Sequence, residues 1–362
     1  MSLDLDTAFQ EFQRILKRHP VLIVGTGASC AVSTRFGMLH LAAQLQRSVR
    51  PSPGTEADQW IKVLEGLKAN KGLEQALDAV SERTLLDEIV ARTGEFVASL
   101  DQEFGWAVAT AVQPAPMAGL LLKLVHGLPP SNPVQEVVTP NYDMLIEHTC
   151  DVLGVPWADG FTAGSTSRRD WEAARNSMLV RTREPRGKRW EDVTRYRPHV
   201  RLHKVHGSIN WFQDADRTRL LRCDARAYGQ PPVGWHRAMI TPGRSKYEDV
   251  ARKRDWFKEA DTAISEANAF LIIGFGFNDD HIHAGIKKRL LDQRCPGIVV
   301  TRDWPPEFEN WIQASSDLWA VCNSTAAGTP ATIIVGPGNL GAPLTCANQN
   351  LWNIADFVEA VM

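Results

Sequence analysis

The chain has 362 residues, which is long enough to bury a large core as one large domain or two medium ones. It is 44% hydrophobic and 23% charged, and its 40 basic and 42 acidic residues give a formal net charge of −2. This balance is typical of a soluble globular protein and gives no overall electrostatic reason for binding nucleic acid or an acidic membrane. Such a contact would require a local basic patch.

The sequence also lacks the usual marks of secretion and of membrane insertion. Residues 1–6 have neither the basic start nor the apolar block of a secretory signal. The apolar run 270–277 is broken by glycines and is far shorter than the ~20 residues of a membrane span. The six cysteines are widely spaced with no C-x-x-C pair, which favours reduced thiols and offers no four-cysteine zinc site. We therefore expect a soluble, cytoplasmic protein.

The first third of the chain predicts one helix, one buried strand and a long helical segment. Residues 5–16 carry an apolar stripe at helical spacing, which ends before Pro20. The continuous apolar run Val21–Val24 is typical of a strand covered on both faces, as in a parallel sheet. From residue 42 to residue 128 helical patterns recur without a convincing strand. This segment is interpreted as a helical insertion or subdomain.

The rest of the chain returns to strands, with one polar interruption. Segment 159–197 is rich in Gly, Ser, Thr and Arg and is interpreted as a flexible, solvated basic loop. A phosphate-facing lid and a partner-binding loop are the alternatives. Strands alternating with helices predict an α/β fold with a doubly wound parallel sheet. The expected strands are 136–138, 200–205, 238–240, 269–273, 298–300 and 331–335, and the expected helices are 256–267, 280–291 and 352–361.

A glycine-rich turn directly follows the first strand. Its residues are Gly25, Thr26, Gly27, Ala28 and Ser29. Glycines at a strand-to-helix turn let the backbone approach a diphosphate closely, although a tight turn without a ligand has the same pattern. The third small residue of the usual dinucleotide fingerprint is replaced by Cys30, so the ordinary dehydrogenase pattern is not met.

Two further polar groups follow later strands. Thr139-Pro-Asn141-Tyr-Asp143 comes after the strand 136–138, where open α/β sheets place ligands; a capped turn is the simpler interpretation of this stretch alone. His206-Gly207 ends the strand 200–205, and a histidine there is a candidate general base because its ordinary pKa lies near neutrality. His203 is interpreted as structural.

In this order, the three motifs resemble the sirtuin family: a G-x-G-x-S turn, a T-x-N-x-D segment and an H-G step. Residues 272–280 extend the match, because they resemble the late glycine turn by which sirtuins hold the adenosine side of NAD. The resemblance covers about 10–50, 130–150, 198–215 and 235–362, and it implies one Rossmann-like NAD-binding domain over 1–362. It implies cofactor contacts at Gly25, Thr26, Gly27, Ala28, Ser29, Thr139, Gly207, Gly274, Phe275 and Gly276.

The sequence also departs from the classical sirtuin deacylases. It cannot supply their four-cysteine zinc ribbon, it has Pro140 where they have glutamine, and it has no clear acyl-peptide segment after the histidine. These departures fit the bacterial sirtuin-like proteins that hydrolyse NAD+ in antiphage defence. That resemblance implies a homo-oligomer working with a HerA-like translocase ATPase, an Argonaute-like protein or another sensor. It implies NAD+ as substrate and no zinc.

The expected chemistry is cleavage of the bond between nicotinamide and ribose. Asn141 would hold a water or the ribose hydroxyl near the reacting carbon, Asp143 would position the nicotinamide amide, and His206 would act as base. A zinc-free protein deacylase, a module that senses NAD or ADP-ribose, and a subunit that binds DNA through the Arg-rich loop are the alternatives. Asp279, His281 and His283 have metal-ligand residue types, but an N-cap at Asp279 or Asp280 is the ordinary explanation and no metal is expected.

Overall fold

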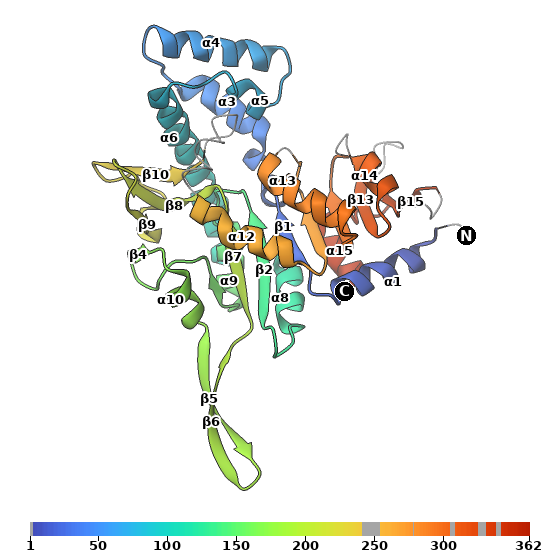
Figure 1. The fold of residues 1–362 in the computed structure, drawn as a ribbon. Helices are drawn as coiled ribbons and strands as arrows, with labels where there is room; N and C mark the ends of the chain where they lie inside the picture. The colour runs from blue at the N-terminus through green and yellow to red at the C-terminus, as the bar shows by residue number, and fades with distance from the viewer. Residues whose placement is uncertain (1–2, 241–253, 278, 305–307, 325–330, 338–341) are drawn as a thin grey trace.

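A nine-stranded sheet forms the centre of the molecule (Figure 1). The structure is a computed structural model and describes residues 3–240, 254–277, 279–304, 308–324, 331–337 and 342–362. The strands of this sheet are β1 (Val21–Val24), β2 (Val134–Thr139), β3 (Trp157–Ala158), β7 (His199–Lys204), β11 (Phe270–Ile273), β12 (Gly297–Thr301), β13 (Leu318–Ser324), β14 (Ala331–Val335) and β15 (Leu344–Ala347).

The strand order is β15-β14-β13-β12-β11-β1-β2-β7-β3. The chain first builds outward from β1 through β2 to β7, then returns to pair β11 with the other edge of β1 and continues through β12 to β13. All pairs from β3 to β13 are parallel, and β14 and β15 add an antiparallel edge. The predicted doubly wound α/β fold is confirmed, and the strand order reverses between β1 and β11.

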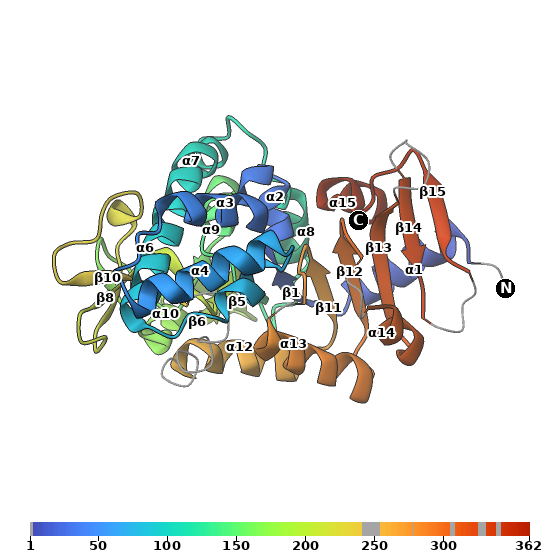
Figure 2. The same ribbon diagram turned by 90° about the horizontal axis from the view of Figure 1, so that it is seen from above.

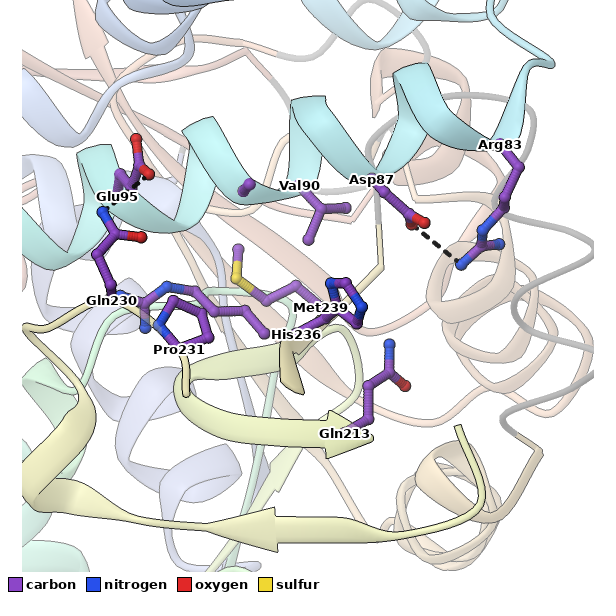
Figure 3. A pocket seen from close by; sticks show the side chains of 11 residues that line it. Arg83, Asp87, Val90, Glu95, Gln213, Gln230, Pro231, His236 and Met239 are labelled. Atoms are coloured by element: carbon purple, nitrogen blue, oxygen red, sulfur yellow. Dashed lines mark hydrogen bonds and ion pairs between the residues drawn. The ribbon is translucent and has the colours of Figure 1, made fainter. Parts of the chain in front are cut away.

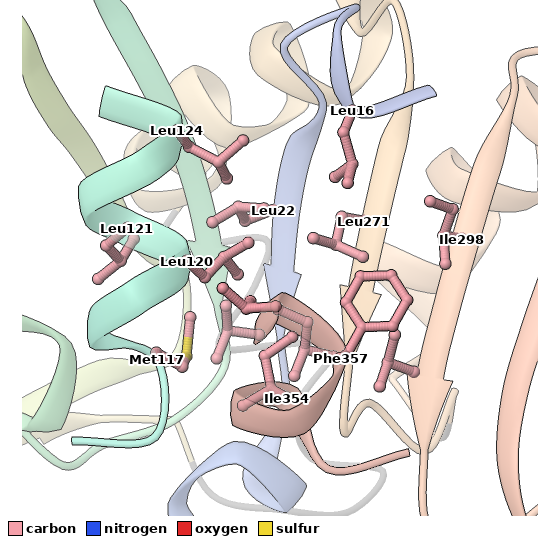
Figure 4. Close-up of a cluster of buried hydrophobic side chains, with 14 of the residues drawn as sticks. Leu16, Leu22, Met117, Leu120, Leu121, Leu124, Leu271, Ile298, Ile354 and Phe357 are labelled. Atoms are coloured by element: carbon pink, nitrogen blue, oxygen red, sulfur yellow. The ribbon is translucent and has the colours of Figure 1, made fainter. Parts of the chain in front are cut away.

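Helices cover both faces of the sheet because successive side chains of each buried strand point to opposite sides. On β1, Leu22 and Val24 face one helical layer, and Val21 and Ile23 face the other. The first layer includes Phe357, which Figure 4 shows among its apolar side chains. The ring of Phe357 lies 5.6 Å from that of Phe12. It contains α1 (Leu5–Leu16), α8 (Ala118–His126), α9 (Leu145–Leu153) and α15 (Ile354–Val361); the second contains α12 (Arg254–Glu266), α13 (Asp280–Lys287), η4 (Lys288–Asp292) and α14 (Phe308–Ala314).

Segment 42–128 contains helices and no strand. Its first part has a core of its own around Leu45, Val63 and Ile89, and it lies above one end of the sheet (Figures 1 and 2). Its last helix, α8, packs on the sheet instead, so it belongs to the Rossmann-like layers. The helices between β1 and α8 are α2 (Thr26–Cys30), η1 (Thr34–Phe36), α3 (Met38–Ser48), α4 (Thr55–Lys68), α5 (Leu73–Leu77), α6 (Arg83–Leu100), η2 (Asp101–Gly105) and α7 (Trp106–Ala109). Among the described residues, no helix is both long and apolar enough to cross a bilayer.

Segment 159–197 is not the flexible loop expected from its composition. It forms a short helix, capped by the Asp170 carboxylate on the amide of Ala173 at 2.9 Å, and an antiparallel hairpin. Val180, Thr182 and Val193 supply β-forming positions among the arginines, and this alternation decides the structure. The elements are α10 (Trp171–Asn176), β5 (Leu179–Arg186) and β6 (Arg189–Tyr196).

A second, antiparallel sheet follows the hairpin in the chain. The predicted strand 238–240 belongs here rather than to the central sheet. The order is β10-β8-β9-β4, with β4 (Ser167–Arg168), β8 (Gly207–Asp214), β9 (Leu220–Arg222) and β10 (Trp235–Met239), and with η3 (Asp224–Arg226) between β9 and β10.

Candidate functional site

Two glycine turns meet where the strand order reverses. The amide of Gly25 donates to the carbonyl of Ile273, and the amide of Gly27 donates to the carbonyl of Gly274, both at 2.9 Å. A Cβ on Gly25 would lie 2.5 Å from the carbonyl oxygen of Gly274, and one on Gly27 would lie 2.6 Å from its Cα. Gly274 itself has a φ of +55°, which favours glycine. Backbone atoms from both halves of the sheet therefore form the floor of the site. Open α/β folds bind their ligands at this position, where the strand order reverses.

Asn141 lies beside this floor, immediately after β2. Its Nδ2 donates to the carbonyl of Gly25 at 3.0 Å and to the hydroxyl of Ser29 at 3.1 Å. Its Oδ1 accepts a longer bond of 3.4 Å from the hydroxyl of Thr26. Both amide hydrogens are thus used to hold the side chain, and Oδ1 keeps a lone pair with which to accept a hydrogen bond from a ligand or water.

Asp143 is buried behind Asn141. One carboxyl oxygen accepts the hydroxyl of Ser29 at 2.7 Å, and the other accepts the amide of Leu145 at 3.2 Å. Burial raises the pKa of the Asp143 carboxyl, although the nearby ammonium of Lys204 opposes this. Ser29 therefore joins Asn141 to Asp143 through one hydroxyl, which accepts from the first and donates to the second.

His206 follows β7 and is buried. Its Nε2 lies 2.6 Å from a carboxylate oxygen of Asp279, which follows β11. The other oxygen of Asp279 accepts the amide of Ile282 at 3.0 Å and caps α13. Sequence reasoning expected only the cap. The contact with His206 joins residues 73 positions apart, and the one available signal was that both follow strands of the same parallel sheet.

Thr139, Ser29 and Gly207 are not among the described residues that line the cleft, and their expected cofactor contacts stay predictions. The hydroxyl of Thr139 is buried, where it donates to the carbonyl of Val24 at 2.7 Å and accepts the amide of Asn141 at 3.1 Å. Gly207 has a φ of +82° and packs against the backbone of β10. Their role is to shape the loops that carry the cleft residues.

A hydrogen bond and an ion pair support the strands behind the site. His203 contacts Glu136 at 2.8 Å, in agreement with a structural role. The ammonium of Lys204 lies 2.8 Å from Glu147 and also donates to the carbonyl of Asp143. Both Lys204 and Glu147 are buried, so the pair ties the start of α9 to β7.

These residues open into a cleft of ≈ 810 Å³, within the range of pockets that hold cofactor-sized ligands. Helices α3 and α6 of the insertion form one wall, with Phe96 and Leu100 among its apolar side chains. Beyond the glycine floor the cleft extends to Arg302 after β12 and to Trp352 before α15. The predicted residues that line it are Gly25, Thr26, Gly27, Ala28, Asn141, Asp143, His206, Gly274, Phe275 and Gly276. Asn278 lies outside the described residues.

A second hollow between α6 and strands β8 and β10 is a packing feature (Figure 3). Its volume is only ≈ 50 Å³. Burial lowers the pKa of the Arg237 guanidinium there to about 10, and its hydrogens are donated to the carbonyls of Ile209 and Gly229. This arginine ties β8 to the segment before β10, and its side chain packs beside Gly94 of α6. Nowhere among the described residues do three or more His, Cys, Asp or Glu side chains gather as metal ligands would.

Residues 135–314 match the family model described as a SIR2-like domain. The matched segment is 180 residues long, just under half of the chain. It includes Asn141, Asp143, His206 and Asp279, whereas the first glycine turn precedes it. The site therefore combines residues of the matched segment with the Gly25–Ser29 turn before it.

Several solved structures are similar to the whole chain at low identity. The structure titled "Structural Basis for the Mechanism and Regulation of Sir2 Enzymes" is 13% identical, with 99% of this chain and 100% of that chain covered and a TM-score of 0.42. "Sir2-p53 peptide-NAD+" is 10% identical, with 98% and 97% covered and a TM-score of 0.40. "The Structural basis of Sirtuin Substrate Affinity" is 12% identical, with 99% and 98% covered and a TM-score of 0.41. No curated protein matches the chain.

Proposed function

We propose that this chain hydrolyses NAD+ to nicotinamide and ADP-ribose. One observation carries the proposal: Asn141 and the His206–Asp279 pair converge on a single cleft beside a floor made of two glycine turns. Such a floor admits a diphosphate close to the backbone, and in this proposal the polar side chains act on the nicotinamide ribose.

The reaction consumes one water and releases one proton. Oδ1 of Asn141 holds the water near the ribose carbon as the bond to nicotinamide breaks and positive charge develops on the ribose. With the Nε2 hydrogen of His206 directed at Asp279, the basic lone pair of the imidazole is on Nδ1, which takes the proton from the water. The new bond joins the water oxygen to the ribose carbon, and nicotinamide leaves with the electron pair of the broken bond. Asp143 positions the amide of the leaving group.

The strand after His206 supports water, rather than an acyl-lysine, as the acceptor. All eight residues of β8 are buried, and β8 lies between β9 and β10 in the antiparallel sheet. A peptide that added itself as a strand would need a free edge, and β8 has a partner on each side. A zinc-free protein deacylase and a sensor of NAD or ADP-ribose without turnover are the alternatives.

The test is incubation of the purified chain with NAD+, followed by chromatography of nicotinamide and ADP-ribose. We expect Asn141→Ala and His206→Ala to abolish the loss of NAD+. Asn132→Ala and His126→Ala, at exposed positions outside the cleft, are matched controls that keep it. Undiminished NAD+ loss in both site variants would refute the assignment. With an acetylated peptide present, O-acetyl-ADP-ribose would favour the deacylase, and tight ADP-ribose binding without turnover would favour the sensor.

The biological setting is proposed from the resemblance of the motifs alone. We propose a cytoplasmic effector of bacterial antiphage defence that depletes NAD+, acts as a homo-oligomer and is controlled by a HerA-like translocase ATPase, an Argonaute-like protein or another sensor. Comparing NAD+ loss with and without the neighbouring gene product tests that control.

A further inference from the structure

The hairpin of β5 and β6 is an arm that pairs with no other strand among the residues that the structure describes. Eight residue pairs join its strands, from Leu179 opposite Tyr196 to Arg186 opposite Arg189. It projects from the end of the molecule opposite the helical insertion (Figure 1). With an axial rise of ~3.3 Å per residue, each strand is roughly 26 Å long. An isolated two-stranded ribbon is marginally stable in water, so a partner that covers it contributes directly to its order.

The arm has the opposite charge to the rest of the chain. Residues 179–196 contain six basic and three acidic side chains, a net charge of 6 − 3 = +3. The remaining residues contain 34 basic and 39 acidic side chains, a net charge of −5. The arm is therefore a positively charged hairpin in a protein whose net charge is negative.

Half of the basic side chains on the arm are neutralised within it. Three ion pairs span its two strands, and their lengths range from 2.6 to 3.0 Å. The pairs are Arg181–Asp192, Arg195–Glu184 and Arg186–Glu191. Arg183, Lys188 and Arg189 are exposed and belong to no ion pair of the described residues. These three cations are the ones available to a partner.

The tip concentrates this charge next to an exposed aromatic ring. Gly187, with a φ of +65°, forms a two-residue turn with Lys188, so that Lys188 is at the apex and Arg186 faces Arg189 across it. Trp190 follows directly and is 61% exposed. An aromatic ring beside unpaired cations suits a surface that offers both phosphates and flat, partly apolar groups.

We infer that this arm binds double-stranded DNA by entering the major groove. The B-form major groove is about 12 Å wide and admits a two-stranded ribbon, whereas the major groove of duplex RNA is too narrow for side chains to read. Arg183, Lys188 and Arg189 contact phosphates on the groove walls, and Trp190 packs on sugars and base edges. The interaction is independent of the glycine floor and of NAD+ cleavage, because no arm residue lines the cleft.

The test is fluorescence anisotropy of the full chain with a labelled 20-base-pair DNA duplex over a range of salt. Three phosphate contacts predict a log–log slope near −2.7, so raising salt from 50 to 200 mM weakens binding about 40-fold. The triple variant Arg183→Gln, Lys188→Gln, Arg189→Gln is expected to lose this salt dependence and at least tenfold in affinity at low salt. The matched control changes three exposed insertion lysines, Lys62→Gln, Lys68→Gln and Lys71→Gln, with the same change of net charge.

Binding that survives in the arm variant, or that falls equally in the control, would overturn the inference, because total charge rather than the arm would then decide. Equal affinity for duplex RNA would overturn the groove geometry. Absence of salt-sensitive DNA binding by the wild-type chain overturns the inference outright. If Trp190→Ser then dissociates an oligomer in size-exclusion chromatography, the arm is a protein interface. Circular dichroism of each variant confirms that the fold is intact.

Discussion

Asp279 makes two contacts that a single substitution can separate. One carboxylate oxygen contacts His206 at 2.6 Å, and the other caps α13 through the amide of Ile282 at 3.0 Å. Asparagine is as good an N-cap as aspartate, so Asp279→Asn keeps the cap through its Oδ1. Its NH2 group then faces Nε2 of His206, which turns that nitrogen into an acceptor and moves the hydrogen to Nδ1. The imidazole loses the lone pair that takes the proton from water.

We therefore expect Asp279→Asn to lower kcat for NAD+ cleavage by about 10²-fold or more, the range that a general base contributes, with little change in KM. Unfolding stability should stay within a few tenths of a kcal/mol, whereas Asp279→Ala loses the cap and about 1 kcal/mol. NAD+ turnover from pH 5.5 to 9 and thermal unfolding supply both readouts. Turnover like that of the wild type across this pH range would refute the role of the carboxylate.

Three further predictions concern the surroundings of the site. Gly25→Ala should destabilise the fold by about 1–3 kcal/mol and weaken ADP-ribose binding, because the added Cβ meets the carbonyl of Gly274 at 2.5 Å; unfolding in urea and calorimetry measure the two effects. Burial raises the pKa of Asp143, so the folded state holds that proton more tightly than the unfolded chain, and this contribution to stability is lost as pH rises from about 4 through the raised pKa. Asp143→Asn should abolish turnover but stabilise the fold at pH 7, by about 1.4 kcal/mol for each unit by which the pKa is raised; equal stability from pH 4 to 8 in both proteins would contradict this. Asp101→Ala removes the acceptor of the Met144 amide and of two side chains, and should lower the free energy of unfolding by about 3 kcal/mol or more in chemical denaturation.

The spacing of apolar residues along the sequence predicted those helices and strands whose buried positions recur at regular intervals. The apolar runs of β1 and β11 and the stripe of α1 are local patterns, and each formed where expected. Strand β13 was missed although the polar residues 315–317 directly precede its apolar run 318–322, and β8 was missed because residues 207–214 mix polar and apolar types. The many arginines in residues 179–196 made the segment look like a solvated loop. The β-forming residues that alternate with them nevertheless form a hairpin.

The sequence predicted only those residues of the candidate site that directly follow a predicted strand. Asn141 and His206 lie after neighbouring parallel strands, so the fold itself brings them to one edge. The contact between His206 and Asp279 depends on β11 returning beside β1, a long-range event that no local pattern encodes. Thr139 and Gly207 sit in the same motifs, and their contacts in the structure are with the carbonyl of Val24 and the backbone of β10.

The glycine floor also limits how this protein can vary. Side chains are excluded where the two turns touch, because any Cβ there meets the opposing main chain at 2.5–2.6 Å. Related chains with the same fold can therefore adjust ligand preference only along the rim, at positions such as Arg302 and Trp352, and through the wall that α6 supplies. We expect homologues to keep the two turns nearly unchanged while the insertion and the rim diverge from one protein to the next.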